Sequence, residues 1–512
     1  MGGGPHGRRE LVIFLTASSA ELLFGLLLVA FWGTTCCSGD ALCHEYIPRL
    51  VLETGNVKHL GVVWPPLLHV LLIPLVGLGP LYSTGLAGTI INSVATGLAC
   101  VYLYRLAGGG AMGLAAPLVF MCNGFTLIYG ATPMMEQLAL ASSLAAAYYL
   151  KRYLEGGRLS DFLRCSIAVS LGCLARYELW ALALAASAAY LAKERGSGPL
   201  PRMAFFLLPF SGVAAWLAWN YYYGGDPLLF LHHPMGPQFH AGASGRWYIN
   251  EEVPLLVSLG HSLAIPASLC MMYAVSGFLL VPAARQVRRL LKARDYKTTF
   301  IAGLLLFPAF FHLLLGPLGL SACSLRYFYV SSPGILLLAF LYYKGAPNGA
   351  RGHAGDFRHT AKLLLTLLAF SYPLHAFALV TGLFPGIYFV DVSEHAVELE
   401  LIAEAIGDGT VLLGTDKAGW LSVLGGLSPE QICDGYDEGF LEAMEEPWSH
   451  VDFVLIERMR PDDPLLLALN ELYGGKFYIY RYYHDPGWRA ELLEHFEPVL
   501  ETEHYLLLGP RP

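Results

Sequence analysis

The sequence predicts a polytopic α-helical membrane protein with a small C-terminal α/β domain. Of its 512 residues, 55% are hydrophobic and 14% are charged, and the mean hydropathy is +0.50. Soluble domains carry about 25% charged residues, so the composition excludes an ordinary soluble chain. Apolar runs long enough for spanning helices recur up to residue 384, and after that Asp, Glu and turn residues become frequent.

Eleven apolar runs are expected to span the membrane. The first follows Arg8 and Arg9 and is too long for a signal peptide, so we expect it to remain uncleaved. A twelfth run, Leu67 to Leu78, is shorter and contains Pro74. The eleven predicted spans lie near residues 11–32, 85–104, 112–130, 134–150, 162–175, 179–193, 203–222, 254–282, 298–320, 328–343 and 361–384.

Basic residues set the predicted orientation, because Lys and Arg near span ends stay on the cytoplasmic side. Arg8–Arg9, Lys151–Arg152, the cluster 285–297 and Lys344 share that side only if an even number of spans separates Arg9 from Lys151. Counting Leu67 to Leu78 as a span breaks this condition, so we expect that run to lie at the outer interface. The prediction is a multi-pass plasma-membrane protein with a cytoplasmic N-terminus.

The chain after residue 384 has no further span. Strand-like stretches at 411–414, 451–456 and 505–508 alternate with helical stretches at 394–406, 464–473 and 488–496. We therefore expect a transmembrane domain over 1–384 and an extracytoplasmic α/β domain over 385–512.

The cysteines and histidines predict no metal centre. None of the ten cysteines forms a CxxC pair, and His232, His233 and His240 have no acidic residue at a ligand spacing. Cys36, Cys37 and Cys43 are candidates for a disulfide in the outer loop, or for small buried side chains. The basic cluster at 285–297 is expected to face anionic membrane lipids, and nothing predicts nucleic-acid binding.

Polar clusters fall on the outer face in this topology, around residues 40–64, 132–136, 176–178, 226–252 and 326–327. Charges at membrane depth are costly unless paired or used. The spans flanking Arg176 are short, so its hairpin is expected to sink below the surface and line a cavity.

The order of these motifs resembles the C-type (GT-C fold) glycosyltransferase superfamily, in particular the protein mannosyltransferase and lipid A aminoarabinose transferase branch. The resemblance covers residues 1 to about 384. Asp40 follows the first span, Gly55 lies fifteen positions later at the end of a helix expected over Leu42 to Glu53, and Trp64-Pro65-Pro66-Leu67 opens a second interfacial helix.

Later positions extend the resemblance. Glu136 follows the third span, Arg176 lies in the short hairpin, and Arg326 precedes Pro333. Gly225-Asp226-Pro227-Leu228 resembles an outer-loop motif of bacterial and archaeal relatives. The sequence departs from both named branches at Ala41, where they usually have a second acidic residue, so the branch is left open.

The resemblance implies an inverting transfer of a sugar from a polyprenyl (dolichyl or undecaprenyl) phosphate to a lipid, glycan or protein acceptor at the outer face. Such a reaction needs a base, groups that stabilise the departing phosphate, and limited water. The alternative is a transporter or flippase of a lipid-linked or anionic substrate. Transporters tend to have inverted repeats and broken helices, and the sequence shows neither.

Two acidic residues are assigned roles by this resemblance. Asp40 is the candidate general base, and its alternative role is an N-cap of the following helix. Glu45 is expected on a solvated face of the same helix. Glu136 would orient the acceptor or help to bind a divalent metal, with a helix-start acid as the alternative. No cofactor is firmly predicted.

The remaining candidates are substrate-binding residues. Arg176 would contact the carrier phosphate, or form a structural ion pair with Glu178. Arg326, followed by Tyr327, would also bind phosphate, or else snorkel to the interface. Further phosphate or sugar contacts, each with an ordinary interfacial alternative, are assigned to Lys58, His59, His69 and Trp64.

Overall fold

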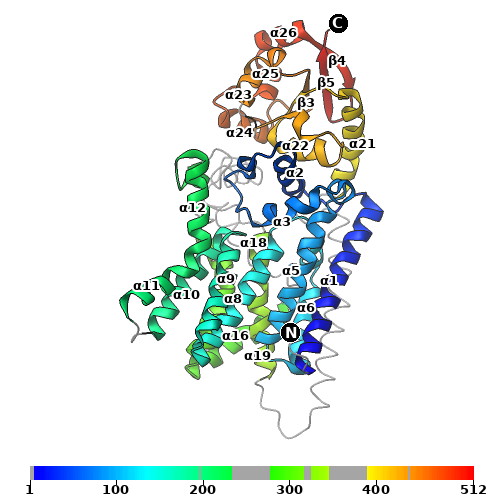
Figure 1. The fold of residues 1–512 in the computed structure, drawn as a ribbon. Helices are drawn as coiled ribbons and strands as arrows, with labels where there is room; N and C mark the ends of the chain where they lie inside the picture. The colour runs from blue at the N-terminus through cyan, green and yellow to red at the C-terminus, as the bar shows by residue number, and fades with distance from the viewer. Residues whose placement is uncertain are drawn as a thin grey trace.

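The computed structural model describes residues 5–194, 198–232, 277–315, 325–344 and 389–511, except Tyr436 and Glu438. Most of the predicted span 254–282, the span 361–384, His233, His240 and the boundary at residue 384 lie outside these ranges. The described chain forms a helical bundle with an α/β unit stacked on one end (Figure 1).

The bundle is built from α-helices that pack along most of their length. Helix α5 contacts α1 and α8, α8 contacts α9, and α19 contacts α16 and α17. The bundle helices are α1 (Pro5–Trp32), α5 (Leu86–Leu106), α6 (Gly110–Met121), α7 (Gly124–Ala131), α8 (Glu136–Gly156), α9 (Leu159–Cys173), α10 (Trp180–Lys193), α11 (Pro199–Leu207), α12 (Ser211–Gly224), α13 (Leu229–His232), α16 (Gly277–Lys292), α17 (Tyr296–Leu315), α18 (Leu325–Tyr329) and α19 (Ser332–Lys344).

Four described helical segments are long and apolar enough to cross a membrane: Gly7–Trp32, Leu86–Leu106, Pro199–Gly224 and Tyr296–Leu315. Helices α9 and α10 have 15 and 14 residues, as expected for the short spans around Arg176. The total of eleven spans stays a prediction.

The expected absence of a broken helix is wrong at one place. Together, Gly113–Met121 and Gly124–Ala131 are long and apolar enough to cross a membrane, but the two helices meet at a bend of 69°. The Asn123 side chain accepts a hydrogen bond from the backbone N–H of Phe125 and so caps α7 as a new helix. The predicted span 112–130 is therefore two helices with a capped break.

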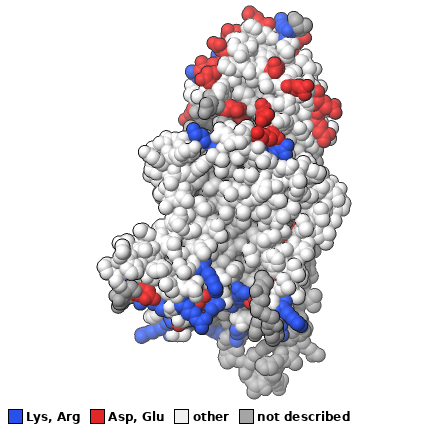
Figure 2. All heavy atoms as spheres, viewed as in Figure 1, with Lys and Arg blue, Asp and Glu red and all other residues white. Residues whose placement is uncertain are grey.

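Basic side chains gather at the end of the bundle farthest from the α/β unit, whose own surface carries most of the acidic groups (Figure 2). Arg105 at the end of α5 pairs with Glu10 at the start of α1, with Nη2 and Oε2 2.6 Å apart. Lys344 at the end of α19 donates to the carbonyl of Gly108. Among the described residues, the basic helix ends that were expected on one side of the membrane therefore lie at one end of the bundle.

Helix α2 (Gly39–Thr54) joins the two parts of the molecule, together with the short elements η1 (Val57–Leu60), α3 (Leu67–Val76) and α4 (Gly79–Ser83). It begins three residues earlier than predicted because the Ser38 hydroxyl accepts a hydrogen bond from the N–H of Ala41. Gly55, with φ 66°, ends it. Asp40 is therefore in the first turn of the helix, and Ser38 is its N-cap.

The α/β unit contains a five-stranded sheet in the order β2-β1-β3-β5-β4. Strand β1 is parallel to β2 and β3, and β5 is antiparallel to β3 and β4. Its elements are α21 (Phe389–Ile406), β1 (Val411–Leu412), α22 (Thr415–Val423), β2 (Ile432–Cys433), α23 (Phe440–Glu445), β3 (Phe453–Glu457), α24 (Pro464–Leu472), α25 (Tyr478–His484), α26 (Pro486–His495), β4 (Phe496–Glu501) and β5 (Tyr505–Pro510).

The two faces of this sheet are covered differently. Val454 and Ile456 of β3 point to the face that packs against residues of α23 to α26. Leu455 points to the opposite face, in one apolar cluster with Tyr46 and Leu50 of α2. Since successive strand residues alternate between faces, α2 covers one face of the sheet while its other side packs on the bundle.

Helix α22 packs directly on α2. A Cβ on Gly419 would lie 2.8 Å from the backbone carbon of Leu42 and 2.9 Å from the nitrogen of Cys43. Beside this contact, the Tyr82 hydroxyl lies 2.6 Å from Ser422 Oγ. The Ser428 hydroxyl donates to Glu53 at 2.9 Å.

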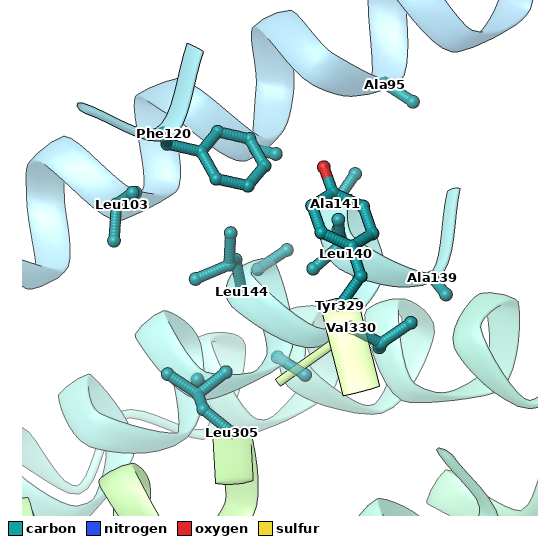
Figure 3. Packing of buried hydrophobic residues seen from close by; sticks show 14 of the residues in the cluster. Ala95, Leu103, Phe120, Ala139, Leu140, Ala141, Leu144, Leu305, Tyr329 and Val330 are labelled. Atoms are coloured by element: carbon teal, nitrogen blue, oxygen red, sulfur yellow. The ribbon is translucent and has the colours of Figure 1, made fainter. Parts of the chain in front are cut away.

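Inside the bundle, Tyr329 fixes the short helix α18. Its ring lies among apolar side chains that include Phe120, Leu140 and Leu144 (Figure 3). Its hydroxyl donates to Thr126 Oγ1 at 2.9 Å and accepts from the amide nitrogen of Gln137 at 3.1 Å. These contacts hold α18, and with it Arg326, against α7 and α8.

Gly419→Ala should weaken the attachment of the α/β unit to α2. The added methyl group meets backbone atoms, which cannot turn aside as a side chain does, so we expect a loss of about 1–3 kcal/mol of stability. Thermal unfolding of the full chain in detergent measures it. Gly303→Ala in α17 is the matched control, because a Cβ at Gly303 would meet nothing within 4 Å. Equal melting temperatures of the two variants would contradict the tight contact.

Candidate active site

Asp40 and Arg326 meet at the end of the bundle that carries the α/β unit. Arg326 Nη1 lies 2.5 Å from Asp40 Oδ2, and the two side chains are 25% and 29% exposed. Asp40 comes from the first turn of α2 and Arg326 from α18. The two residues therefore lie on the same side of the bundle, as the predicted topology requires.

Two buried histidines lie next to this pair. His44 follows Asp40 by one helical turn, and its Nδ1 is 2.8 Å from Nε2 of His69 in α3. Trp64 packs edge-on against His44, with ring centroids 5.0 Å apart. Burial lowers the pKa of His44 to about 4, although Asp40 acts in the opposite direction. The pair is therefore neutral at physiological pH, and one ring donates to the other.

Arg176 forms a second ionic cluster with two buried carboxylates. Its Nη1 donates to Glu136 Oε1 at 2.8 Å, and its Nε donates to Glu178. His312 of α17 lies 3.8 Å from Glu178. Glu136 is the first residue of α8, so the cluster ties the hairpin between α9 and α10 to that helix start.

The two ionic clusters belong to one polar region. After burial, the nearby guanidinium groups of Arg326 and Arg176 also lower the pKa of His44. The hairpin also reaches the first loop, because the Tyr177 hydroxyl donates to the carbonyl of Val63 at 2.9 Å. Of the predicted residues, Asp40, Glu136, Arg176, Glu178 and Arg326 are thus brought together.

Glu45 does not lie on a solvated face, as the sequence suggested; it is fully buried. Its Oε1 accepts a hydrogen bond from the backbone N–H of Gly88, in the first turn of α5, at 2.8 Å. Burial raises the pKa of Glu45 to about 8, against the effect of this hydrogen bond. A Cβ on Gly88 would lie 2.2 Å from Pro133, so Glu45 sits where α2, α5 and the loop before Glu136 meet.

The other predicted residues are placed less centrally. Lys58 is exposed on η1. His59 is near Asp437 of the α/β unit: burial raises the pKa of Asp437, and His59 acts against this rise. His69 is buried against His44, and its phosphate contact stays a prediction. Tyr327 belongs to α18, but its side chain lies outside the described part of the chain.

The three cysteines of the first loop form no disulfide with one another. Cys36, Cys37 and Cys43 are all buried thiols, which matches the alternative of small apolar side chains. Burial raises the pKa of the Cys37 thiol to about 12, so it stays protonated.

The described residues contain no group of three or more His, Cys, Asp or Glu side chains placed to hold a metal ion. Glu136, the acid considered for a divalent metal, is instead paired with Arg176.

Sequence reasoning did not identify His44 and His69 as a pair. The spacing of four from Asp40 to His44 was a usable signal, because residues i and i+4 lie on one helix face. The contact with His69 depends on how α3 folds back on α2, and no local pattern encodes it.

No family model and no curated protein matches the sequence. Solved structures do match, across nearly the whole chain. ArnT from Cupriavidus metallidurans bound to undecaprenyl phosphate is 10% identical, with a TM-score of 0.55, covering 99% of this chain and 98% of that one. The archaeal oligosaccharyltransferase AglB from Archaeoglobus fulgidus, in complex with an inhibitory peptide and a dolichol-phosphate, is 14% identical. Its TM-score is 0.51, covering 88% of this chain and 69% of that one.

Both of these proteins are GT-C fold enzymes. The chain therefore shares the GT-C fold of these two proteins. At these identities the likeness concerns the fold, and the chemistry has to be argued from the residues of this chain.

Arg176→Met should be strongly destabilising. It leaves Glu136 and Glu178 buried without their shared guanidinium, and breaking a buried ion pair costs about 3–5 kcal/mol. The melting temperature in detergent is the readout. Arg158→Met is the matched control, because Arg158 is exposed. If both variants melt alike, the Arg176 cluster does not support the fold.

Glu45→Ala and Glu45→Gln should behave differently. The alanine leaves the N–H of Gly88 unpaired, at a cost of about 1–3 kcal/mol, whereas the glutamine oxygen can still accept this bond. The measurement is the melting temperature of both variants and of the unsubstituted chain at pH 5, and only Glu45→Ala should melt clearly lower.

The pH dependence gives a second test of Glu45. Its folded pKa of about 8 exceeds the ordinary value of 4.5. Its contribution to stability is therefore complete below pH 4.5 and is lost as pH rises through 8, by at most about 1.4 kcal/mol per pH unit. Glu45→Gln, which has no proton to lose, should flatten this decline between pH 5 and 8.5. Parallel curves would show that Glu45 is not held protonated.

Proposed function

We propose that the chain is an inverting glycosyltransferase that moves a sugar from a polyprenyl phosphate to an acceptor at the membrane face below the α/β unit. The observation that carries the proposal is the Asp40–Arg326 pair. It places a carboxylate and a guanidinium, both partly exposed, in contact at the end of an apolar bundle. The two similar structures are complexes with undecaprenyl phosphate and with a dolichol-phosphate, which supports a polyprenyl-phosphate donor.

In the proposed reaction the acceptor oxygen attacks the anomeric carbon from the side opposite the phosphate. The new carbon–oxygen bond forms as the bond between the anomeric carbon and the phosphate oxygen breaks, and the configuration inverts. Asp40 takes the acceptor proton, and the bonding electrons leave with the phosphate. Arg326 turns from Asp40 to the phosphate and stabilises its developing charge.

The roles of the other residues follow from their place. Arg176 is held by two carboxylates, so its proposed part is to position Glu136 and Glu178, with Glu136 near the acceptor. His44, His69 and Trp64 form the packed wall behind Asp40. The sugar and the acceptor, whether lipid, glycan or protein, are not identified by these contacts.

The proposed orientation puts the α/β unit outside the cell. The basic residues collect at the opposite end of the bundle (Figure 2), which is the arrangement that the positive-inside rule gives for a cytoplasmic N-terminus. The bent helix pair α6–α7 is a feature that transporters also have. A transporter, however, gives no role to the Asp40–Arg326 pair at the end of the bundle below the α/β unit.

Asp40→Asn should abolish sugar transfer while the chain remains folded. The amide cannot accept the proton, and loss of a general base lowers rates by about 10²–10⁴-fold. The assay supplies radiolabelled polyprenyl-phosphate sugars and a membrane extract to the purified full chain. Asp462→Asn, at an exposed position of the α/β unit, is the control.

Arg326→Met should also lower transfer, and it should weaken donor binding.

Full transfer by Asp40→Asn would remove Asp40 from the mechanism. Movement of the labelled lipid across proteoliposomes, with no label on any acceptor, would favour the flippase instead.

A further inference from the structure

A cluster of titratable and aromatic side chains lies in the α/β unit directly beside the start of α2, and the proposed reaction does not use it. Its centre is Trp420 of α22, whose indole nitrogen would lie 3.3 Å from a Cβ placed on Gly39, the residue before Asp40. Gly39, Asp40 and Trp420 are all partly exposed. The cluster is therefore continuous with the candidate active site.

Charged groups in this cluster occur as pairs. Lys417 Nζ lies 3.0 Å from Glu457 Oε1 and 4.8 Å from the centroid of the Trp420 ring. His504 Nδ1 lies 2.7 Å from Glu398 Oε1. Lys417 and His504 each have a carboxylate beside them, so the cluster presents both hydrogen-bond donors and acceptors.

Trp420 and His395 are both partly exposed. Among the described residues, no hydrogen bond is found for the indole N–H of Trp420. Nδ1 of His395 is 2.9 Å from the Tyr505 hydroxyl, so the ring is fixed while its Nε2 is left without a described partner. The His395 ring lies at the edge of Trp420, with centroids 5.2 Å apart.

We propose that Trp420, His395 and the Lys417–Glu457 pair form a binding subsite for a neutral saccharide, placed to hold the acceptor beside Asp40. This inference rests on the proposed function and names the acceptor class for the same site. An aromatic wall with a few fixed polar groups is the usual make-up of a small-molecule site. Sugar hydroxyls both donate and accept, which matches the indole N–H, the imidazole nitrogen and the paired charges.

The pairing of charges favours a neutral sugar over an anionic group. A phosphate or an anionic lipid headgroup could bind Lys417 only if the lysine left Glu457, as Arg326 leaves Asp40 in the proposed reaction. Here the carboxylate of Glu457 would repel an anion at Lys417, and Glu398 would repel one at His504. Burial and Lys417 also lower the pKa of His395 to about 4, so it adds no positive charge at neutral pH.

The test measures binding apart from catalysis. The full chain in detergent is applied to an array of immobilised neutral oligosaccharides ending in mannose, glucose, galactose or N-acetylglucosamine. The expected result is retention of the unsubstituted chain. Trp420→Ala should bind about tenfold more weakly, and His395→Gln and Lys417→Met more weakly by smaller factors. Trp448→Ala is the matched control, because Trp448 stacks on His495 elsewhere in the same unit.

Trp420→Phe guards against misfolding. It keeps an aromatic ring at the contact with α2 but removes the N–H, so it should melt like the unsubstituted chain and still bind the saccharides more weakly. The proposal is wrong if both Trp420 variants bind as the unsubstituted chain does, or if that chain retains none of the saccharides. Trp420-dependent binding to phosphatidylglycerol vesicles in place of the array would also overturn it.

Asp40→Asn tests the transfer reaction independently of saccharide binding at Trp420. It should retain saccharide binding while losing transfer. If it retains transfer, Asp40 is not the base, but the Trp420 subsite is still judged by the array alone. In a transfer assay, Trp420→Phe should raise the KM for the acceptor and leave the KM for the polyprenyl-phosphate sugar unchanged.

Discussion

The structure depends on the burial of helix α2 from two sides. Ten of its sixteen residues are buried, against the bundle on one side and against the sheet of the α/β unit on the other. Burying polar groups without partners is costly, and three polar side chains of this helix bind residues outside it. His44 finds His69, Glu45 finds the N–H of Gly88, and Asp40 finds Arg326. The same contacts that solve the burial problem also fix where Asp40 lies.

Charge at the outer end of the bundle follows a similar constraint. Arg176 and Arg326 each have a carboxylate at hydrogen-bonding distance, and Arg176 has two. The two pairs differ in exposure: Arg176 is 12% exposed with carboxylates that are almost fully enclosed, whereas Asp40 and Arg326 each expose about a quarter of the side chain. A pair that is partly solvated can separate and exchange partners at lower cost than an enclosed one. This difference is why the reaction is assigned to Asp40 and Arg326, and the supporting role to Arg176.

The sequence predicted the broad fold because its strongest signals are spread over many residues. Apolar runs and the side on which Lys and Arg gather do not depend on any single contact, and together they predicted that Asp40 and Arg326 lie at the same end of the bundle. The predictions failed at positions where a single contact determines the local structure. Glu45 was placed in solvent because α2 has no simple polar face, and a helix covered on two sides does not show the pattern of a half-exposed one. Asn123 lies in a continuous apolar run, and only its side-chain cap reveals the bend. The Asp40–Arg326 contact joins distant segments, so position after a span could suggest each residue but not the distance between them.

Sharing α2 between two parts has a consequence for how the site can work. A base must be held within about 0.5 Å of its productive position by a rigid support. A helix resting on the membrane surface alone would not provide that precision, because one of its faces would be free to rotate. Gly419 lets α22 pack backbone to backbone on Leu42, and the apolar cluster around Leu50 and Leu455 continues from α2 into the sheet. This packing fixes the distance between Asp40 and Trp420, so a group bound at Trp420 would be held at a set distance from the proposed base. Arg326 belongs to α18 of the bundle, so the Asp40–Arg326 contact joins two separate helices. In the proposed reaction this contact opens when a phosphate enters.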